Sequence, residues 1–199
     1  ILINEGTANR PAFADARKIL AEEKPIRLLR NEILGGEHWH NMGYSYPTYV
    51  DWDGDGLPDL LLPNETNRIY WHKNIGSRRE PKFGPRQQIL CDGFPDSPKL
   101  RAATVRLTNK DNPYPTDASS PFFWRTGAAF ADFNGDGLCD MITHDGEKRV
   151  AILFVQFRDT GGGLRLKRHG ELRLKDGQPI DDRIVGRKQH WTESFRPVD

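Results

Sequence analysis

Short runs of apolar and β-branched residues alternate with turn-forming residues along most of the chain. Runs of this length, bounded by Gly, Pro, Asn and Asp, predict β-strands joined by tight turns. The expected strands fall at 46–50, 59–62, 68–73, 87–90, 128–131, 141–143, 150–157 and 171–174, with outlying strands near 2–4 and 26–29. A short helix is expected over 11–23, which is rich in Ala, Lys and Glu. The pattern as a whole predicts an all-β protein.

The composition agrees with an all-β chain and excludes several classes of function. The 199 residues could bury a sizeable core, but only 36% are hydrophobic, and 19 Gly and 14 Pro separate the short strands. The 29 basic and 28 acidic residues nearly balance, and no basic stripe alternates with aromatic residues, so nucleic acid is not an expected partner. No apolar run approaches the length of a membrane span. Cys91 and Cys139 make no disulfide framework, and we expect two free thiols.

Two nine-residue segments share one pattern of acidic residues and glycines. Residues 51–59 read DWDGDGLPD, and residues 132–140 read DFNGDGLCD. Side-chain oxygens occur at positions 1, 3, 5 and 9, and the Gly at position 6 permits a sharp turn. Carboxylates this close together repel one another unless a cation lies between them. Because hard oxygen ligands in this number suit Ca²⁺, the sequence predicts two calcium-binding loops.

These loops differ from the EF-hand, the most familiar calcium-binding loop. An EF-hand has a bidentate Glu at position 12 and a helix on each side. Position 12 is Leu62 in the first segment and Thr143 in the second, and the flanking residues have the character of strands. Each loop is therefore expected to join two strands of a β-hairpin. The alternative is a polar turn without a metal, which Asp and Gly also favour. Two copies in the same frame argue against that alternative.

The loops belong to a longer repeat. Residues 4–13, NEGTANRPAF, recur at 74–83 as NIGSRREPKF, an offset of 70 residues. A third strand pattern at 194–198 leads into Asp199, which aligns with position 1 of a further loop. We therefore expect about three repeat units, of which the first and last are incomplete, in a piece of a larger protein.

The nine-residue motif, its strand flanks, the N-x-G-[ST]…P-x-F segment and the period near 70 resemble the FG-GAP/VCBS repeat family. The resemblance covers nearly the whole chain, although the family's Phe-Gly…Gly-Ala-Pro element is not evident. It implies consecutive four-stranded antiparallel blades of a β-propeller, with each loop between the first and second strands of a blade. It also implies that Ca²⁺ is bound by the side chains at positions 1, 3, 5 and 9 and the carbonyl at position 7. The implied ligands are Asp51, Asp53, Asp55, Leu57 (carbonyl) and Asp59, and Asp132, Asn134, Asp136, Leu138 (carbonyl) and Asp140.

On this interpretation the chain has four parts. Residues 1–45 hold the end of one blade and a connection, and 46–125 hold a blade with a calcium loop and an insertion at 92–125. Residues 126–180 form a second blade with a calcium loop, and 181–199 begin the next one. A long insertion in a compact fold is often functional. Oxygen sites of this kind fill readily at millimolar Ca²⁺, which predicts an extracellular, periplasmic or cell-surface location.

Candidate chemistry outside the loops is concentrated in residues 37–46, EHWHNMGYSY. His38 and His40 could act as bases, and Tyr44 or Tyr46 as an acid, in β-elimination from an acidic polysaccharide. Aromatic rings there also offer flat apolar faces to sugars. The simpler interpretation is that these side chains lie at the rim of the fold and do no chemistry.

Three functions follow from these interpretations. The first is a binding module for a carbohydrate or a protein partner, which also contacts the remaining blades of the parent chain. The second is part of a catalytic propeller, for which the resemblance offers polysaccharide lyase activity. The third is a structural spacer in a large secreted protein.

Overall fold

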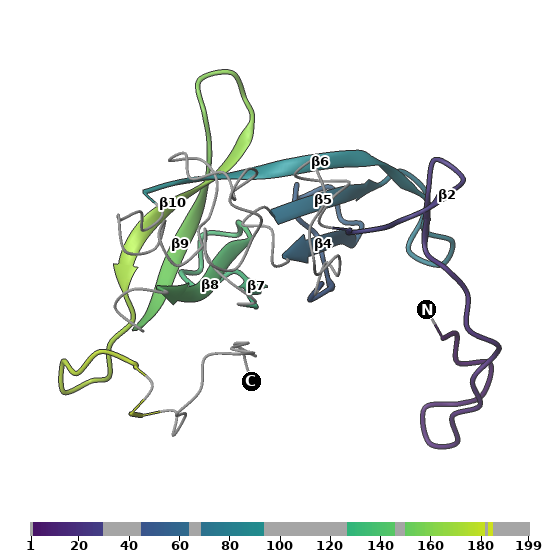
Figure 1. Ribbon diagram of the computed structural model, residues 1–199, viewed down its shortest axis with the longest axis horizontal. Coiled ribbons are helices and arrows are strands. Elements are labelled where there is room, and N and C mark those ends of the chain that lie inside the picture. The colour runs from purple at the N-terminus through teal and green to yellow at the C-terminus, as the bar shows by residue number, and fades with distance from the viewer. Residues whose placement is uncertain are drawn as a thin grey trace.

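The computed structural model describes residues 2–29, 45–63, 69–93, 127–145, 150–181 and 183–184, and these form strands, turns and no helix (Figure 1). No helix in this part of the chain is therefore long and apolar enough to cross a membrane. The strands are β1 (Leu20–Ala21), β2 (Lys24–Pro25), β3 (Thr48–Val50), β4 (Asp59–Pro63), β5 (Ile69–Asn74), β6 (Phe83–Asp92), β7 (Ala129–Ala131), β8 (Asp140–Asp145), β9 (Val150–Arg158) and β10 (Leu164–Glu171). The all-β prediction is confirmed for the described residues.

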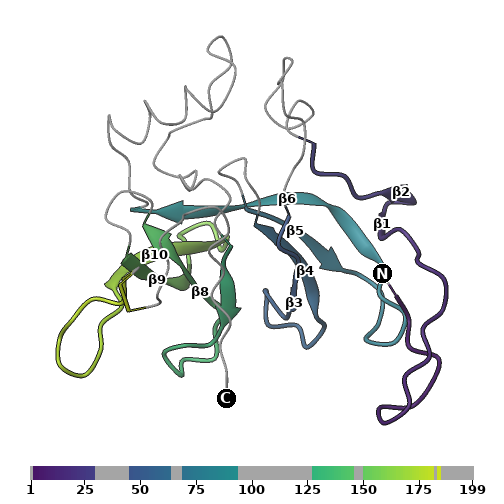
Figure 2. The same ribbon diagram turned by 60° about the horizontal axis from the view of Figure 1, so that its bottom comes forward.

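Eight of these strands form two four-stranded antiparallel meanders. The first meander is β3-β4-β5-β6, and the second is β7-β8-β9-β10. Their last strands, β6 and β10, pair in parallel, so that β6 runs along both meanders (Figure 2). The first strands, β3 and β7, lie at the two ends of this sheet and contact each other. The eight strands therefore make a nearly closed, barrel-like sheet.

Four of the predicted elements are wrong. The outlying strands expected near 2–4 and 26–29 are not formed, and Asn4 makes only an isolated bridge to Phe13. The helix expected over 11–23 is absent, and residues 20–25 instead form the β1–β2 hairpin. Glu22 and Glu23 turn this hairpin with φ values of 49° and 64°, so the tertiary fold overrides their helix propensity. The strand expected at 171–174 is also misplaced, because β10 ends at Glu171. The other strands of the two meanders agree with the prediction to within a few residues, except that β6 is considerably longer.

Large apolar side chains from both meanders meet in one shared core. Side chains alternate between the two faces of each strand, and the first meander directs Leu61, Ile69 and Trp71 toward the second. Trp52, in the first nine-residue loop, meets Phe130 edge to face with ring centroids 6.3 Å apart. The remaining buried members of this shared core are Ile89, Cys91, Ala128, Cys139, Met141, Ile152, Phe154 and Leu166.

The two meanders contribute opposite faces to the shared core. The nine-residue loops align Leu60 with Met141 and Leu61 with Ile142, since both pairs directly follow position 9. Leu61 and Met141 lie in the shared core, whereas Leu60 points to the other side of its sheet. The meanders therefore stack front to back: one face of the first packs on the opposite face of the second. In a sandwich with two-fold symmetry, the same face of each sheet would meet. Such stacking can continue from one unit to the next.

A second core covers the other face of the first meander. It contains Leu60, Leu62, Tyr70 and Phe83, and residues 19–28 pack on it. This N-terminal segment covers the Leu60 face of the first meander. The first meander in turn covers the equivalent face of the second meander, which carries Met141.

Both cysteines are buried and free, as predicted. Cys91 and Cys139 belong to the shared core. Burial raises the pKa of Cys139 to about 12 and raises the pKa of Cys91 as well. Both side chains therefore remain neutral thiols and act as small apolar groups.

The repeat of residues 4–13 at 74–83 is confirmed as a repeat of structure. The Asn74 side chain accepts hydrogen bonds from the backbone amides of Gly76 (3.0 Å) and Lys82 (3.2 Å). Asn4 makes the equivalent bonds to residues 6 and 12, both at 3.0 Å. The environments of the two hairpins differ, because Phe83 is buried in the second core and Phe13 is 61% exposed.

Gly76 occupies a position in this hairpin that tolerates no side chain. A Cβ there would lie 2.4 Å from the carbonyl oxygen of Glu80 and 2.7 Å from the amide nitrogen of Lys82. Both neighbours are backbone atoms, so relief requires the hairpin to open. We expect Gly76→Ala to lower the free energy of unfolding by about 1–3 kcal/mol, measured by urea denaturation.

Gly84→Ala is the matched control, because its added Cβ would make ordinary contacts at 3.6 Å and beyond. It should leave stability unchanged to within about 1 kcal/mol. Equal losses in both variants would contradict the described hairpin.

Candidate metal centre

The first nine-residue loop joins β3 to β4 and is folded by the carboxylate at its first position. Asp51 accepts hydrogen bonds from the backbone amides of Gly54 (2.9 Å), Asp55 (3.1 Å) and Gly56 (2.8 Å). The two glycines have φ values of 78° and 87°, in the left-handed region that other residues rarely adopt. The shape of the loop is therefore defined by hydrogen bonds to its own first residue and by its two glycines.

The second loop, between β7 and β8, repeats this geometry. Asp132 accepts hydrogen bonds from Gly135 (2.7 Å), Asp136 (3.1 Å) and Gly137 (2.9 Å). The bond from Gly137 is the largest cause of a lowered pKa at Asp132, because each amide stabilises the ionised carboxylate. Two loops with the same sequence pattern therefore share the same backbone fold.

The carboxylate at position 9 ties the loop to a third strand. Asp59 is fully buried and accepts hydrogen bonds from the amides of Trp52 (3.2 Å) in the loop and Asn74 (2.6 Å) on β5. Loss of solvent raises the pKa of Asp59 to about 6, although both amide bonds oppose this shift. The loop thus holds a desolvated negative charge that nearby positive charge would stabilise.

Asp140 has the same role in the second loop. The strand to which it is tied, β9, also contacts the first loop. Asp140 accepts hydrogen bonds from the amides of Phe133 (3.3 Å) and Gln156 (3.0 Å), and burial raises its pKa. The Gln156 side chain then donates to the carbonyl of Trp52 at 3.0 Å. The two loops lie side by side around a cavity of 240 Å³, which is lined by Val50, Asp51, Trp52, Gly54, Asp132, Gly137, Leu138, Cys139 and Gln156.

Three carboxylates of the first loop converge. Asp51, Asp53 and Asp59 each offer an oxygen atom within 4.8 Å of the others. The Oδ1 atom of Asp53 is buried without a hydrogen-bond partner. A buried oxygen without a partner is costly, and a coordinated cation would satisfy it. The donor set therefore fits a hard divalent cation.

Asp55, the predicted ligand at position 5, has other partners. One of its oxygens accepts the amide of Leu57 at 2.9 Å, and the other accepts Lys73 at 2.7 Å. The Lys73 ammonium also pairs with Asp53, and these two hydrogen bonds raise the pKa of Lys73. Sequence reasoning missed this lysine, because it lies 18 residues from Asp55 in the sequence and on another strand.

The second loop differs at position 3. Asn134 donates to Asp136 at 2.9 Å and accepts the backbone amide of the same residue at 2.9 Å. Among the residues that the structure describes, a group of three or more converging Asp, Glu, His or Cys side chains occurs only in the first loop. The ligand set of the second loop and the carbonyl ligands of Leu57 and Leu138 stay predictions.

The residues proposed for catalysis lie mostly outside the described ranges. His38, His40 and Tyr44 do so, as does nearly all of the 92–125 insertion. Tyr46 is half-buried, and its backbone amide donates to the carbonyl of Pro63 at 2.9 Å. The convergence of these four side chains therefore stays a prediction.

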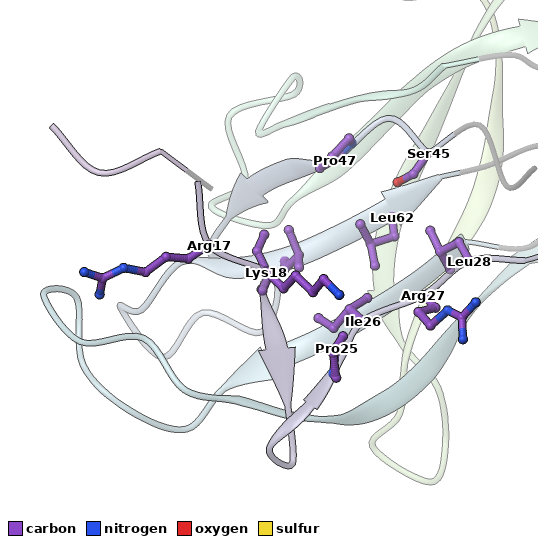
Figure 3. A pocket seen from close by; sticks show the side chains of 11 residues that line it. Arg17, Lys18, Pro25, Ile26, Arg27, Leu28, Ser45, Pro47 and Leu62 are labelled. Atoms are coloured by element: carbon purple, nitrogen blue, oxygen red, sulfur yellow. The ribbon is translucent and has the colours of Figure 1, made fainter. Parts of the chain in front are cut away.

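Ser45 and Pro47, the neighbours of Tyr46, line a cavity of 890 Å³ (Figure 3). Its remaining lining comes from residues 17–19, 25–28 and β4. Leu28 and Leu62 contribute apolar surface, whereas Arg17, Lys18 and Arg27 bring positive charge. The sequence signal for this cavity was present, because basic residues flank the apolar positions of this stretch, but it was interpreted only as secondary structure.

No family model, curated protein or solved structure matches this chain. The evidence for its function therefore comes from its own residues and geometry.

The geometry predicts different effects for two neighbouring carboxylates. In the presence of a chelator, Asp51→Ala should destabilise the protein by roughly 1–3 kcal/mol, because three backbone amides lose their acceptor. Asp53→Ala should cost less than about 1 kcal/mol, because Asp53 pairs only with a partly exposed lysine and removal also eliminates a buried oxygen without a partner. Urea denaturation of both variants in chelator measures the difference. A larger loss for Asp53→Ala would contradict this account of the loop.

Proposed function

We propose that this chain is a calcium-stabilised segment of a β-propeller and serves as a binding module of a secreted protein. The observation that carries the proposal is the pair of loops with one sequence pattern and one backbone fold. Their resemblance to FG-GAP/VCBS repeats supports the same assignment. The location that follows is extracellular, periplasmic or at the cell surface, where Ca²⁺ reaches millimolar concentration.

Calcium is the cation that best suits these loops. The side chains offer only oxygen atoms, which disfavours transition metals that prefer nitrogen and sulfur. Ca²⁺ accepts six to eight oxygen ligands in flexible geometry, whereas Mg²⁺ demands a strict octahedron. In the first site the ligands are Asp51, Asp53, Asp55 and Asp59 with the Leu57 carbonyl. In the second site they are Asp132, Asn134, Asp136 and Asp140 with the Leu138 carbonyl.

Propeller architecture is supported by the way that the meanders stack. In a propeller every unit presents one face to the preceding blade and the opposite face to the next one. The front-to-back contact of Leu61 with the face that carries Met141 is of this kind. On this proposal each meander is one blade, residues 2–29 belong to the preceding blade, and the chain supplies about three blade equivalents.

The ligand is proposed to be an acidic carbohydrate bound in the 890 Å³ cavity. Lys18 and Arg27 match the carboxylates of such a ligand in charge, and the apolar floor suits the faces of sugar rings. Ser45, which belongs to the predicted segment from His38 to Tyr46, lines this cavity. The same observation favours the second candidate, a polysaccharide lyase in which a His is the base and a Tyr is the acid.

Calcium binding is tested by titration calorimetry of the chelated protein. We expect two sites, of which Asp53→Ala removes one and Asp136→Ala the other. Added Ca²⁺ should also raise the midpoint of thermal unfolding, because it binds the folded chain preferentially. No heat and no thermal shift at millimolar Ca²⁺ would refute the calcium assignment.

Ligand binding is tested with a short oligouronate, and a neutral oligosaccharide of equal length controls for charge. We expect the oligouronate to bind, and the double variant His38→Ala, His40→Ala to abolish binding while calcium affinity is unchanged. Arg27→Ala should weaken binding roughly tenfold. Lys24→Ala, an exposed change three residues before Arg27 and outside the cavity lining, should have no effect.

Release of unsaturated uronate would identify the lyase. If none of these substitutions changes oligouronate binding, the ligand site lies elsewhere. If the oligouronate does not bind at all, the remaining hypothesis is a structural spacer.

A further inference from the structure

The first loop carries a positive charge of its own. We infer that Lys73 acts as an internal counter-ion that lowers the calcium affinity of the first site and maintains its shape without calcium. Within the described part of the chain, the second site has no such residue. This inference rests on the proposed function of the loops, and it concerns how the two sites differ.

The contacts of Lys73 show which ligands it occupies. Its ammonium group reaches from β5 to Asp53 and Asp55, at positions 3 and 5 of the loop. Both carboxylates belong to the proposed ligand set. A calcium ion that uses their oxygens must therefore take the place of the lysine. Because Lys73 is about one-third exposed (34%), its side chain can swing into solvent without rearrangement of the core.

The second meander provides an internal comparison. Lys73 follows His72, which pairs with Leu60, and Val155 follows Phe154, which pairs with Met141. Leu60 and Met141 both directly follow position 9 of their loops. Val155 therefore occupies the place of Lys73, and it carries no charge.

A second difference compensates for the first. Position 3 is Asp53 in the first loop and Asn134 in the second. Among the proposed ligand side chains, the first site therefore has four carboxylates and the second has three. Arg78 and Arg158 also donate to carbonyls of the first loop, at Gly56 (3.0 Å) and Asp53 (3.4 Å), but only Lys73 contacts the ligand carboxylates. At position 5, the Oδ2 atom accepts a side-chain hydrogen bond in both loops. The donor is Lys73 for Asp55 and the Asn134 amide for Asp136. The lysine thus neutralises the additional carboxylate.

Calcium binding changes the charge balance of the first site, because the ion must displace the ammonium group of Lys73 from Asp53 and Asp55. If calcium displaced the ammonium group, the ion would have four carboxylates as neighbours, and both ion pairs of Lys73 would be lost. Without Lys73, the four carboxylates would repel one another in the absence of calcium and attract calcium more strongly. Lys73 therefore weakens calcium binding at the first site and makes the stability of the first loop less dependent on calcium.

The test uses each site in isolation. Asp136→Ala leaves the first site as the only site, and Lys73→Met is added because Met has a similar length without the charge. Calorimetry should show roughly tenfold tighter calcium binding with Lys73→Met, and the gain should shrink as salt is raised. Urea denaturation in chelator should show that Lys73→Met is less stable and that Lys73→Arg retains the wild-type stability.

The reciprocal change uses Asp53→Ala, which leaves only the second site. Val155→Lys in this background should weaken calcium binding by a similar factor. Equal affinities of the first site with and without Lys73→Met would overturn the role of Lys73. A complete absence of calcium binding in the Asp136→Ala protein would instead refute the proposed function of the first loop. The two failures are therefore distinguishable.

Discussion

Each meander depends on one buried carboxylate that joins three segments of chain. Asp59 belongs to the second strand, and it binds an amide of the loop before it and an amide of the third strand. Asp140 does the same in the second meander. A single side chain therefore ties the loop to the second and third strands, while the carboxylate at position 1 folds the loop itself. Burial makes this charge costly, which explains why both loops bring polar groups and proposed cation ligands close to it.

The same constraint links the two meanders. Gln156 gives its backbone amide to Asp140 and its side chain to the carbonyl of Trp52. Trp52 in turn fills the shared core beside Phe130. Trp52, at position 2 of the first loop, is thus in contact with β9, the strand that binds Asp140 of the second loop. Packing between the meanders and the shape of the loops cannot change independently.

The loops and most strands could be predicted from the sequence because their signals are local. Side chains such as Asp51 contact amides three to five residues away, so spacing alone specifies the turn. The repeat at 74–83 was visible for the same reason, since Asn74 binds amides within its own hairpin. In both cases glycines occur where the backbone has a left-handed conformation or where another part of the chain leaves no room for a Cβ atom.

The errors arose where the decisive contacts are distant in sequence. Residues 20–25 have the composition of a helix, but Ala21 pairs with Phe83 on β6, which the local sequence does not reveal. Lys73 was not recognised as part of the site, because its carboxylate partners lie in the preceding hairpin. The front-to-back packing was likewise hidden, because Leu61 and Ile142 occupy the same place in the repeat and only Leu61 lies in the shared core.

The buried thiols have a consequence for the chemical durability of the folded chain. Disulfide exchange and oxidation proceed through the thiolate, which Cys91 and Cys139 do not form at neutral pH inside the shared core. In the folded protein Cys91 is completely buried and is therefore shielded from oxidants. Cys139 lines the cavity between the loops, where its raised pKa keeps it in the less reactive thiol form. Both thiols become fully accessible in the unfolded chain, so they are most vulnerable between synthesis and closure of the core.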